Sequence, residues 1–298
     1  STALNAAMGT RRCLAEQGYA GTHPVWGRFA MNIAMPLTAR AIPSDYRLRM
    51  PGPAAIPERV RAATALPILS HRGPEFRVIL DEVTRLMRGV LGTTQDVFVL
   101  GGSGTAGMEA ALVNVLSDGD AVLVVENGQF GERFSSIAEG LPVQLDRLQI
   151  PWGEVPDAAE IARRVKAKAY RAVVVVHNES ATGVVADLAA IGAVLRDTET
   201  LLVVDSVSGV GGVEMRMDDW GVDVLVTASQ KCLMNPPGRL VGIVGHAIDH
   251  VRGKIAPLPG AMRAARSRAT RFISDSSDPT TAQTCAEALA FAAGMGLL

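Results

Sequence analysis

Apolar positions in this 298-residue chain form short continuous runs that alternate with stretches of helical periodicity. The continuous runs predict buried strands at 96–100, 121–125, 172–177, 201–205, 222–227 and 239–244. Between several of these runs, apolar residues recur every three or four positions, which predicts helices at 105–116, 131–140, 158–169 and 188–198. Strands that alternate with helices at this spacing indicate an α/β fold, with a mostly parallel sheet covered by helices on both faces.

The first 45 residues have a different pattern. A short helix is predicted at 4–17, followed by irregular sequence with Gly, Pro and isolated large residues. Regular periodicity begins near Tyr46, with one helix predicted from Pro57, where proline suits a first turn, and another over 75–91. We therefore expect residues 1–45 to form an extension, either an arm or a disordered segment.

Composition excludes several classes of protein. Hydrophobic residues make up 48% and charged residues 20% of the chain, which favours a packed core over disorder. Lys and Arg number 29 against 30 Asp and Glu, so a net charge of −1 gives no electrostatic reason to expect nucleic acid or an anionic membrane as partner. The arginine-rich stretch at 263–271 is interpreted as a solvated helix face.

Cysteine usage and hydropathy point to a cytoplasmic protein. The three cysteines, Cys13, Cys232 and Cys285, are too few and too scattered for a disulfide framework or a zinc site. A reduced protein without a bound metal is therefore expected. We also expect neither a membrane span nor a secretion signal, because no apolar run reaches about 18 residues and the first ten residues lack the pattern of a signal.

Candidate chemistry lies where the predicted strands end, since ligands of parallel sheets bind at the carboxyl ends of the strands. The first strand is followed by Gly102-Ser103-Gly104-Thr105 and a helix, whose N–H groups and dipole form a potential anion site. Such turns also cap helices without binding anything. The Walker lysine is absent, and the glycine spacing fits a dinucleotide site only loosely.

Two ionisable residues follow later strands. Asp205 ends a buried run, where a carboxylate needs a positive or hydrogen-bonding partner, although it could simply cap the next segment. Lys231 lies 26 residues further on, among small and apolar neighbours. Desolvation favours a neutral, nucleophilic amine, although a salt bridge is the commoner role for such a lysine. Together, an anion-binding turn, an acid and a lysine predict a phosphorylated pyridine cofactor, pyridoxal 5′-phosphate (PLP).

In these stretches the sequence resembles the class V (fold type I) PLP-dependent aminotransferases, and most closely their alanine–glyoxylate and serine–pyruvate branch. The similarity extends over about residues 46–245. The matching stretches occur in family order: MPGP (50–53), SHRGPEF (70–76), GSGTAGMEAALVNVL (102–116), ENGQFGERF (126–134), HNESATGV (177–184), VDSVSGVGG (204–212), SQKCL (229–233) and NPPG (235–238).

The resemblance implies a role for each matching residue. Lys231 would be the Schiff-base lysine and the proton carrier, and Asp205 would pair with the pyridine nitrogen. The remaining residues would surround the cofactor and the substrate. Ser103, Gly104 and Thr105 would hold the phosphate, with Gln230 as a further donor. Phe130 would stack on the ring, Ser180 would lie near the ring oxygen, and Gly52 would lie at the substrate mouth.

The resemblance also implies a homodimer with shared active sites, and a domain order of an arm (1–45), a large PLP-binding domain (46–265) and the start of a small domain (266–298). From the length of the sequence we expect most of this small domain to be missing. The family's tyrosine–threonine pair for the partner's phosphate has no clear counterpart; Ser276, Ser277, Thr280 or Thr281 could replace it. The family's arginine for the substrate carboxylate is expected to be absent, unless Arg239 or an arginine of 263–271 replaces it.

The function expected from the resemblance is a ping-pong aminotransferase acting on a small L-amino acid such as alanine or serine and a 2-oxo acid such as pyruvate or glyoxylate. One alternative is a PLP-dependent lyase on the same scaffold; a cysteine desulfurase is disfavoured because Cys232 directly follows the lysine and is expected to be packed. The other is a PLP-binding protein without turnover. The amino donor and acceptor stay open.

Overall fold

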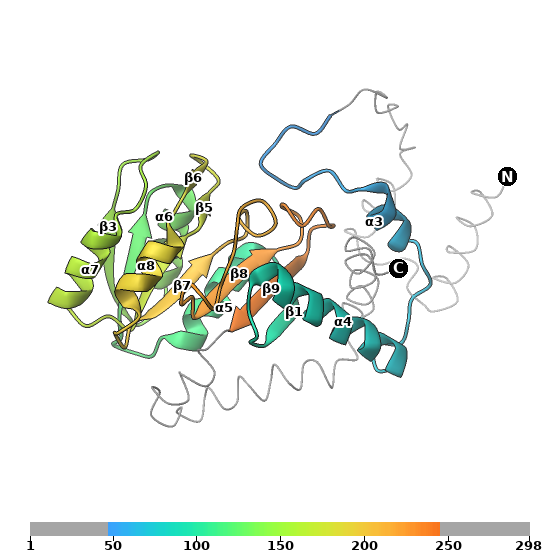
Figure 1. The fold of residues 1–298 in the computed structure, drawn as a ribbon, viewed down its shortest axis with the longest axis horizontal. Coiled ribbons are helices and arrows are strands. Elements are labelled where there is room, and N and C mark those ends of the chain that lie inside the picture. Colours follow the sequence, from blue (N-terminus) through green and yellow to red (C-terminus); the bar gives the residue numbers. More distant parts are fainter. Residues whose placement is uncertain (1–46, 245–298) are drawn as a thin grey trace, which may run out of the picture. The chain divides into compact units, whose positions relative to one another are not determined.

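The computed structural model of the chain describes residues 47–244, the last six of them in backbone alone (Figure 1). The predicted helix at 4–17, the arm 1–45, the segment 266–298 and the arginine-rich stretch lie outside the described residues. The elements within them are α3 (Glu58–Ala63), α4 (Pro74–Leu91), β1 (Val97–Gly101), α5 (Gly104–Val115), β2 (Ala121–Glu126), α6 (Gln129–Glu139), β3 (Gln144–Gln149), α7 (Ala158–Ala167), β4 (Ala172–Val176), β5 (Asn178–Glu179), β6 (Val184–Val185), α8 (Leu188–Leu195), β7 (Leu201–Asp205), β8 (Val224–Ala228) and β9 (Arg239–Val244).

Seven of these strands form one sheet in the order β1-β9-β8-β7-β4-β2-β3 (Figure 1). From β8 to β3 every neighbouring pair is parallel, whereas β9 is antiparallel to both β8 and β1. Because β9 alone reverses, β1 runs in the same direction as β8. The carboxyl ends of β1, β8, β7, β4 and β2 therefore lie along one edge of the sheet.

The strands alternate their side chains between two apolar cores. In β2, Leu123 and Val125 face the core beneath α4, α7 and α8, whereas Val122 and Val124 face the core beneath α5 and α6. This period of two explains why β2, β4 and β7 are apolar at nearly every position, since both faces are covered. The mostly parallel α/β fold predicted from the sequence is confirmed.

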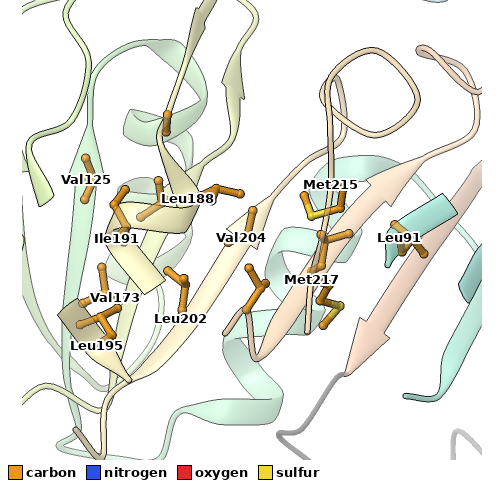
Figure 2. Packing of buried hydrophobic residues seen from close by; sticks show 14 of the residues in the cluster. Leu91, Val125, Val173, Leu188, Ile191, Leu195, Leu202, Val204, Met215 and Met217 are labelled. Atoms are coloured by element: carbon orange, nitrogen blue, oxygen red, sulfur yellow. The ribbon is translucent and has the colours of Figure 1, made fainter. Parts of the chain in front are cut away.

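Figure 2 shows how the first core is filled. Leu188, Ile191 and Leu195 recur along one side of α8 and lie over Val173 and Leu202 of the sheet. Full burial of a Leu or Ile side chain contributes about 1.5–3 kcal/mol to stability, so this one apolar stripe is enough to hold α8 on the sheet. Met215 and Met217 extend the same core toward Leu91 at the end of α4.

Two parts of the fold were not predicted. Strand β3 at the sheet edge reads Gln-Leu-Asp-Arg-Leu-Gln, and only Leu148 of it is fully buried, so it lacks the continuous apolar run of the inner strands. The hairpin of β5 and β6 has two residues in each strand, which is too short for a period to be visible. Within residues 47–244, no helix is long and apolar enough to cross a membrane.

Candidate active site

Every described residue that the sequence analysis selected, apart from Gly52, follows one of the strands that end along the same edge of the sheet. Ser103, Gly104 and Thr105 follow β1, and Phe130 follows β2. Ser180 follows β4, Asp205 ends β7, and Gln230 and Lys231 follow β8. The remaining residue, Gly52, comes from the irregular segment before α3 and reaches this edge through contacts with Lys231.

The turn after β1 forms the N-terminus of α5. Ser103 is the N-cap residue, and its Oγ accepts the N–H of Ala106 at 3.2 Å. Gly104 is buried, and a β-carbon on it would lie 3.0 Å from a methyl group of Val207 and 3.8 Å from the β-carbon of Ala228 in β8. The first-turn N–H groups of α5 therefore lie beside the segment that follows Asp205, and together with the helix dipole they form a site suited to an anion.

Asp205 is almost fully buried, and one carboxylate oxygen accepts the N–H of Val207 at 2.7 Å. Burial raises the pKa of Asp205 to about 6, and the negative charge of Glu179 acts in the same direction. The Val207 N–H and the positive charge of Lys231 act against this rise. A carboxylate whose charged form is disfavoured by burial is stabilised by a cationic hydrogen-bond donor, such as a protonated ring nitrogen.

Lys231 is partly buried and contacts the segment before α3. Its Nζ donates to the carbonyl oxygen of Pro51 at 3.3 Å, and the N–H of Ala54 donates to the carbonyl oxygen of Gln230 at 2.7 Å. A β-carbon on Gly52 would lie 2.8 Å from Nζ and 2.9 Å from Cε of Lys231. A glycine at this position therefore leaves the space that the lysine side chain occupies.

Phe130 lies in the first turn of α6 and is partly buried against the core beneath that helix. The guanidinium of Arg133 lies 5.7 Å from the centre of its ring. The same guanidinium donates to the Oγ1 of Thr105 at 3.3 Å. Arg133 thus connects the predicted stacking ring with the predicted phosphate turn, a role that the sequence analysis did not assign to it.

Ser180 lies in the loop between β5 and β6. Its Oγ donates to the Oγ of Ser208 at 2.8 Å, and the Oγ of Ser208 donates to the carbonyl oxygen of Asn178 at 2.8 Å. The Sγ of Cys232 lies 3.5 Å from the carbonyl oxygen of Ser208. These contacts place the loop after β4 next to the segment that follows Asp205 and the one that contains Lys231.

His177 and Glu179 are buried at the same edge, and neither was predicted from the sequence to have a role. The Nδ1 of His177 lies 2.9 Å from the Oγ of Ser206, and the backbone N–H of His177 donates to the carbonyl oxygen of Asp205 at 2.8 Å. Burial lowers the pKa of His177 to about 4, so its imidazole is neutral at pH 7. A signal for both residues was present in the stretch 177–184, whose family match includes them.

These residues fit PLP by their chemistry. The helix N-terminus suits the phosphate, the buried carboxylate of Asp205 suits a protonated pyridine nitrogen, and the amine of Lys231 suits an aldehyde. The fit of Gly52 against the Lys231 side chain keeps this amine at the edge. Of the arginines considered for the substrate carboxylate, Arg239 is described in backbone alone, at the start of β9, and those of 263–271 lie outside the described residues.

Comparison with known proteins finds aminotransferases among the relatives of this chain. The family model described as Aminotransferase class-V matches residues 60–272. An L-aspartate–glyoxylate aminotransferase of Paracoccus denitrificans is 40% identical over 236 residues, which cover 77% of this chain and 59% of that protein. A serine–glyoxylate aminotransferase of Hyphomicrobium methylovorum is 38% identical over 214 residues, which cover 70% of this chain and 53% of that protein.

Solved structures agree with this result. The crystal structure of an alanine–glyoxylate aminotransferase from Nostoc sp. matches with a TM-score of 0.74 and 26% identity, covering 89% of this chain and 72% of that one. The chain spans about half the length of the curated relatives it matches, with 50%, 59% and 51% of the first three covered.

Proposed function

Since the chain belongs to the class-V aminotransferase family, whose members depend on PLP, we propose that it binds PLP and transfers an amino group between a small L-amino acid and a 2-oxo acid. The observation that carries this proposal is the common position of Lys231, Asp205 and the N-terminus of α5 at one edge of the sheet. Family membership and local chemistry point to the same cofactor by independent routes.

The proposed role of each residue follows from its contacts. Ser103, Gly104 and Thr105 would hold the phosphate through the first turn of α5, with Gln230 as a further donor. Asp205 would hold the ring nitrogen protonated, and Phe130 and Ser180 would lie against the ring face and the ring oxygen. Gly52 would leave room for Lys231 and for the substrate beside it. When bound, PLP supplies an electron sink that makes the Cα proton of an amino acid acidic.

Lys231 would have two tasks in this scheme. Its Nζ would hold the aldehyde carbon of the cofactor, and, once displaced by the amino group of the substrate, the same amine would move the Cα proton. The carbonyl oxygen of Pro51, 3.3 Å from Nζ, gives the free amine a hydrogen-bond acceptor that orients it.

For the substrates, we propose alanine or serine as amino donor and glyoxylate or pyruvate as acceptor, in a ping-pong sequence. Glyoxylate stands in the names of the aspartate, serine and alanine aminotransferases that this chain resembles, whereas the donors in those names differ. The acceptor is therefore the better supported half of the proposal. A homodimeric assembly and a cytoplasmic location, both expected from the sequence, belong to the same proposal.

The test uses the full chain, loaded with PLP and freed of excess. We expect a visible absorption band that Lys231→Ala abolishes, with Lys231→Arg as a control that keeps the charge but not the reactive amine. Alanine or serine added without an acceptor should release one equivalent of its 2-oxo acid per bound PLP. A band without any 2-oxo acid would support cofactor binding without turnover, and release of ammonia would support a lyase. A protein that binds no PLP would contradict the whole proposal.

A further inference from the structure

The side chain of Glu179, at the end of β5, is fully buried and connects two segments that are far apart in the sequence. Its Oε2 accepts the N–H of Phe130 at 2.9 Å and the N–H of Gly131 at 3.3 Å. Its Oε1 accepts the N–H of Ala181 at 3.0 Å. One carboxylate therefore holds both the start of α6 and the loop between β5 and β6.

This contact replaces the usual cap of α6. The N-cap residue of α6 is Gly128, which has no side chain to accept the first-turn N–H groups. Those groups are left without partners inside a helix and attract negative charge. Glu179 supplies that charge from another element, and the three N–H donors offset part of the cost of burying a carboxylate.

Gly128 also shows how closely the carboxylate is fitted. A β-carbon on Gly128 would lie 2.6 Å from Cδ of Glu179. The φ angle of Gly128 is 165°, which is extended backbone that any residue adopts, so its conformation alone does not require glycine. The steric reason for glycine at 128 is therefore the side chain of Glu179.

The two segments held in this way carry Phe130 and Ser180. Phe130 receives the contact on its own N–H, and Ser180 lies between Glu179 and Ala181, whose N–H is also held. The proposed function places these two side chains at the face and the ring oxygen of PLP, and the inference that follows rests on that proposal.

We propose that Glu179 is a positioning residue that fixes the aromatic ring of Phe130 relative to the hydroxyl of Ser180, and so fixes the orientation of the cofactor ring. Glu179 does this through backbone N–H groups, without touching the cofactor. Phe130 belongs to the first turn of α6 and Ser180 to the loop between β5 and β6, and the carboxylate of Glu179 sets the distance between these two segments.

A matched control is available in Glu126, a second buried carboxylate that also holds α6. It accepts a hydrogen bond from Ser135 in the middle of that helix and one from Gln149 of β3 at 3.2 Å. Its loss should loosen α6 without affecting the N–H groups of Phe130, Gly131 and Ala181. Comparing Glu179→Gln with Glu126→Gln thus separates positioning from general stabilisation of the helix.

The experiment measures amide hydrogen exchange on the PLP-free chain and visible circular dichroism on the PLP-loaded chain. Glu179→Gln keeps the shape but leaves one acceptor oxygen in place of two, so at least one of the two contacts must be lost. We expect exchange at Phe130 and Gly131, at Ala181, or at all three to become at least about tenfold faster, which is the effect of losing a hydrogen bond to a charged group. We also expect a changed circular dichroism signal from the bound cofactor.

Gly128→Ala provides a second route to the same result, because it displaces the carboxylate and keeps its charge. It should show the same exchange and circular dichroism changes, whereas Glu126→Gln should show neither. If Glu179→Gln lowers thermal stability as Glu126→Gln does but leaves exchange at the three N–H groups and the circular dichroism unchanged, the proposal is wrong. Unfolding of both Glu179→Gln and Gly128→Ala beside a folded Glu126→Gln would also overturn it, because the role of Glu179 would then be purely structural.

Failure of the proposed function gives a different result. A wild-type chain that binds no PLP contradicts the cofactor proposal and, with it, the role of Glu179 toward a cofactor ring. A wild-type chain that binds PLP while Glu179→Gln binds it with the same dichroism contradicts the role of Glu179 alone. The exchange measurement, which needs no cofactor, still reports in both cases whether the carboxylate joins the first turn of α6 to the loop between β5 and β6.

Discussion

The Nζ of Lys231 donates to the carbonyl oxygen of Pro51 at 3.3 Å, across 180 residues of sequence. The next residue, Gly52, has a φ angle of +146°, and a β-carbon on it would lie 2.8 Å from the same nitrogen. The segment before α3 therefore restricts both the space around the proposed reactive amine and its hydrogen bonding.

Substitution of Gly52 by alanine should displace the side chain of Lys231 and so weaken the binding of PLP. The new methyl group needs the space of the Lys231 side chain, and the positive φ angle adds backbone strain of about 1–3 kcal/mol. We expect Gly52→Ala to weaken PLP binding by at least about tenfold, measured by titration of the visible absorption band.

The control is Gly119→Ala. Gly119 also has a positive φ angle, +84°, but no atom lies within 4 Å of the position of its β-carbon. This variant should lose stability and keep its affinity for PLP. Equal affinities in the two variants would mean that the contact between Gly52 and Lys231 has no bearing on the cofactor.

Asp205 and His177 should give the PLP-free protein two opposing dependences of stability on pH. Burial raises the pKa of Asp205 to about 6, above its unfolded value near 4, so the folded state binds the extra proton and stability falls as the pH rises from about 4 to 6. Burial lowers the pKa of His177 to about 4, below its unfolded value near 6.5, so stability falls as the pH decreases from 6.5 to 4.

The two effects should nearly cancel in the wild type, and Asp205→Asn should reveal the histidine alone. One pKa unit corresponds to about 1.4 kcal/mol. As the pH decreases from 6.5 to 4.5, His177 should lower the free energy of unfolding of the variant by about 2–3 kcal/mol, whereas the two residues together should change that of the wild type by less than about 1 kcal/mol. Urea unfolding at both pH values measures the difference. Parallel pH profiles for the two proteins would contradict the burial argument for Asp205.

Much of the fold could be predicted because the buried strands are continuous in sequence. The run Ala172–Val176 is buried at every position, and the helix 188–195 repeats its apolar residues on one side, so local pattern and tertiary burial agree. Strand β3 was missed because it is an edge strand in which only Leu145 and Leu148, one on each face, pack against the cores, and exposed Gln144 and Gln149 break any continuous apolar run.

From the residues alone, the candidate site could be predicted only where an ionisable residue or a glycine turn follows a strand end, whereas Gly52, Phe130, Ser180 and Gln230 were selected through the family resemblance. Asp205 and Lys231 could be selected in this way, because an ionisable residue after an apolar run is unusual in itself. Glu179 and Arg133 were not selected, although both lie in matching stretches (177–184 and 126–134), since their importance depends on partners in other segments. The contact between Glu179 and Phe130 spans 49 residues, and nothing in the local sequence around Glu179 indicates that its carboxylate accepts the N–H of Phe130.

Cys232 separates the aminotransferase proposal from a thiol-dependent reaction on the same fold. It directly follows Lys231, its Sγ lies 3.5 Å from the carbonyl oxygen of Ser208, and a β-carbon on Gly212 would lie 2.7 Å from the sulfur. A thiol held by these contacts is a packing residue.

We therefore expect Cys232→Ala to keep its visible band and its release of 2-oxo acid within about twofold of the wild type. Its free energy of unfolding should fall by about 1 kcal/mol, because the substitution removes one partly buried sulfur atom. Two quantities are measured on each protein: the amount of 2-oxo acid released from alanine per bound PLP, and the free energy of unfolding in urea. A variant that is stable but inactive would favour a reaction that needs the thiol.

Arg133 should strengthen binding of the cofactor phosphate through its charge. The guanidinium donates to the Oγ1 of Thr105 and is exposed to solvent beside the first turn of α5, where the phosphate is proposed to bind. An exposed charge beside a bound anion contributes about 1 kcal/mol or less to the free energy of binding, and salt screens this contribution. Arg133→Gln should therefore weaken the binding of PLP and of inorganic phosphate about threefold to fivefold at low ionic strength. This effect should shrink at 0.5–1 M salt, roughly in step with the Debye length.

The matched control for this prediction is Arg163→Gln on α7, since Arg163 is also exposed and is already paired with Glu160 at 2.7 Å. It changes the net charge of the chain by the same amount, far along the sequence from the turn after β1, and should leave both affinities unchanged. A different result would be that Arg133→Gln weakens the binding of PLP but not of inorganic phosphate, and does so equally at all salt concentrations. The guanidinium would then act by packing on the ring of Phe130, 5.7 Å away, because support of that ring affects only a ligand with a pyridine ring and is little screened by salt. Salt dependence of the affinity thus distinguishes a counter-charge for the phosphate from a support for the aromatic ring.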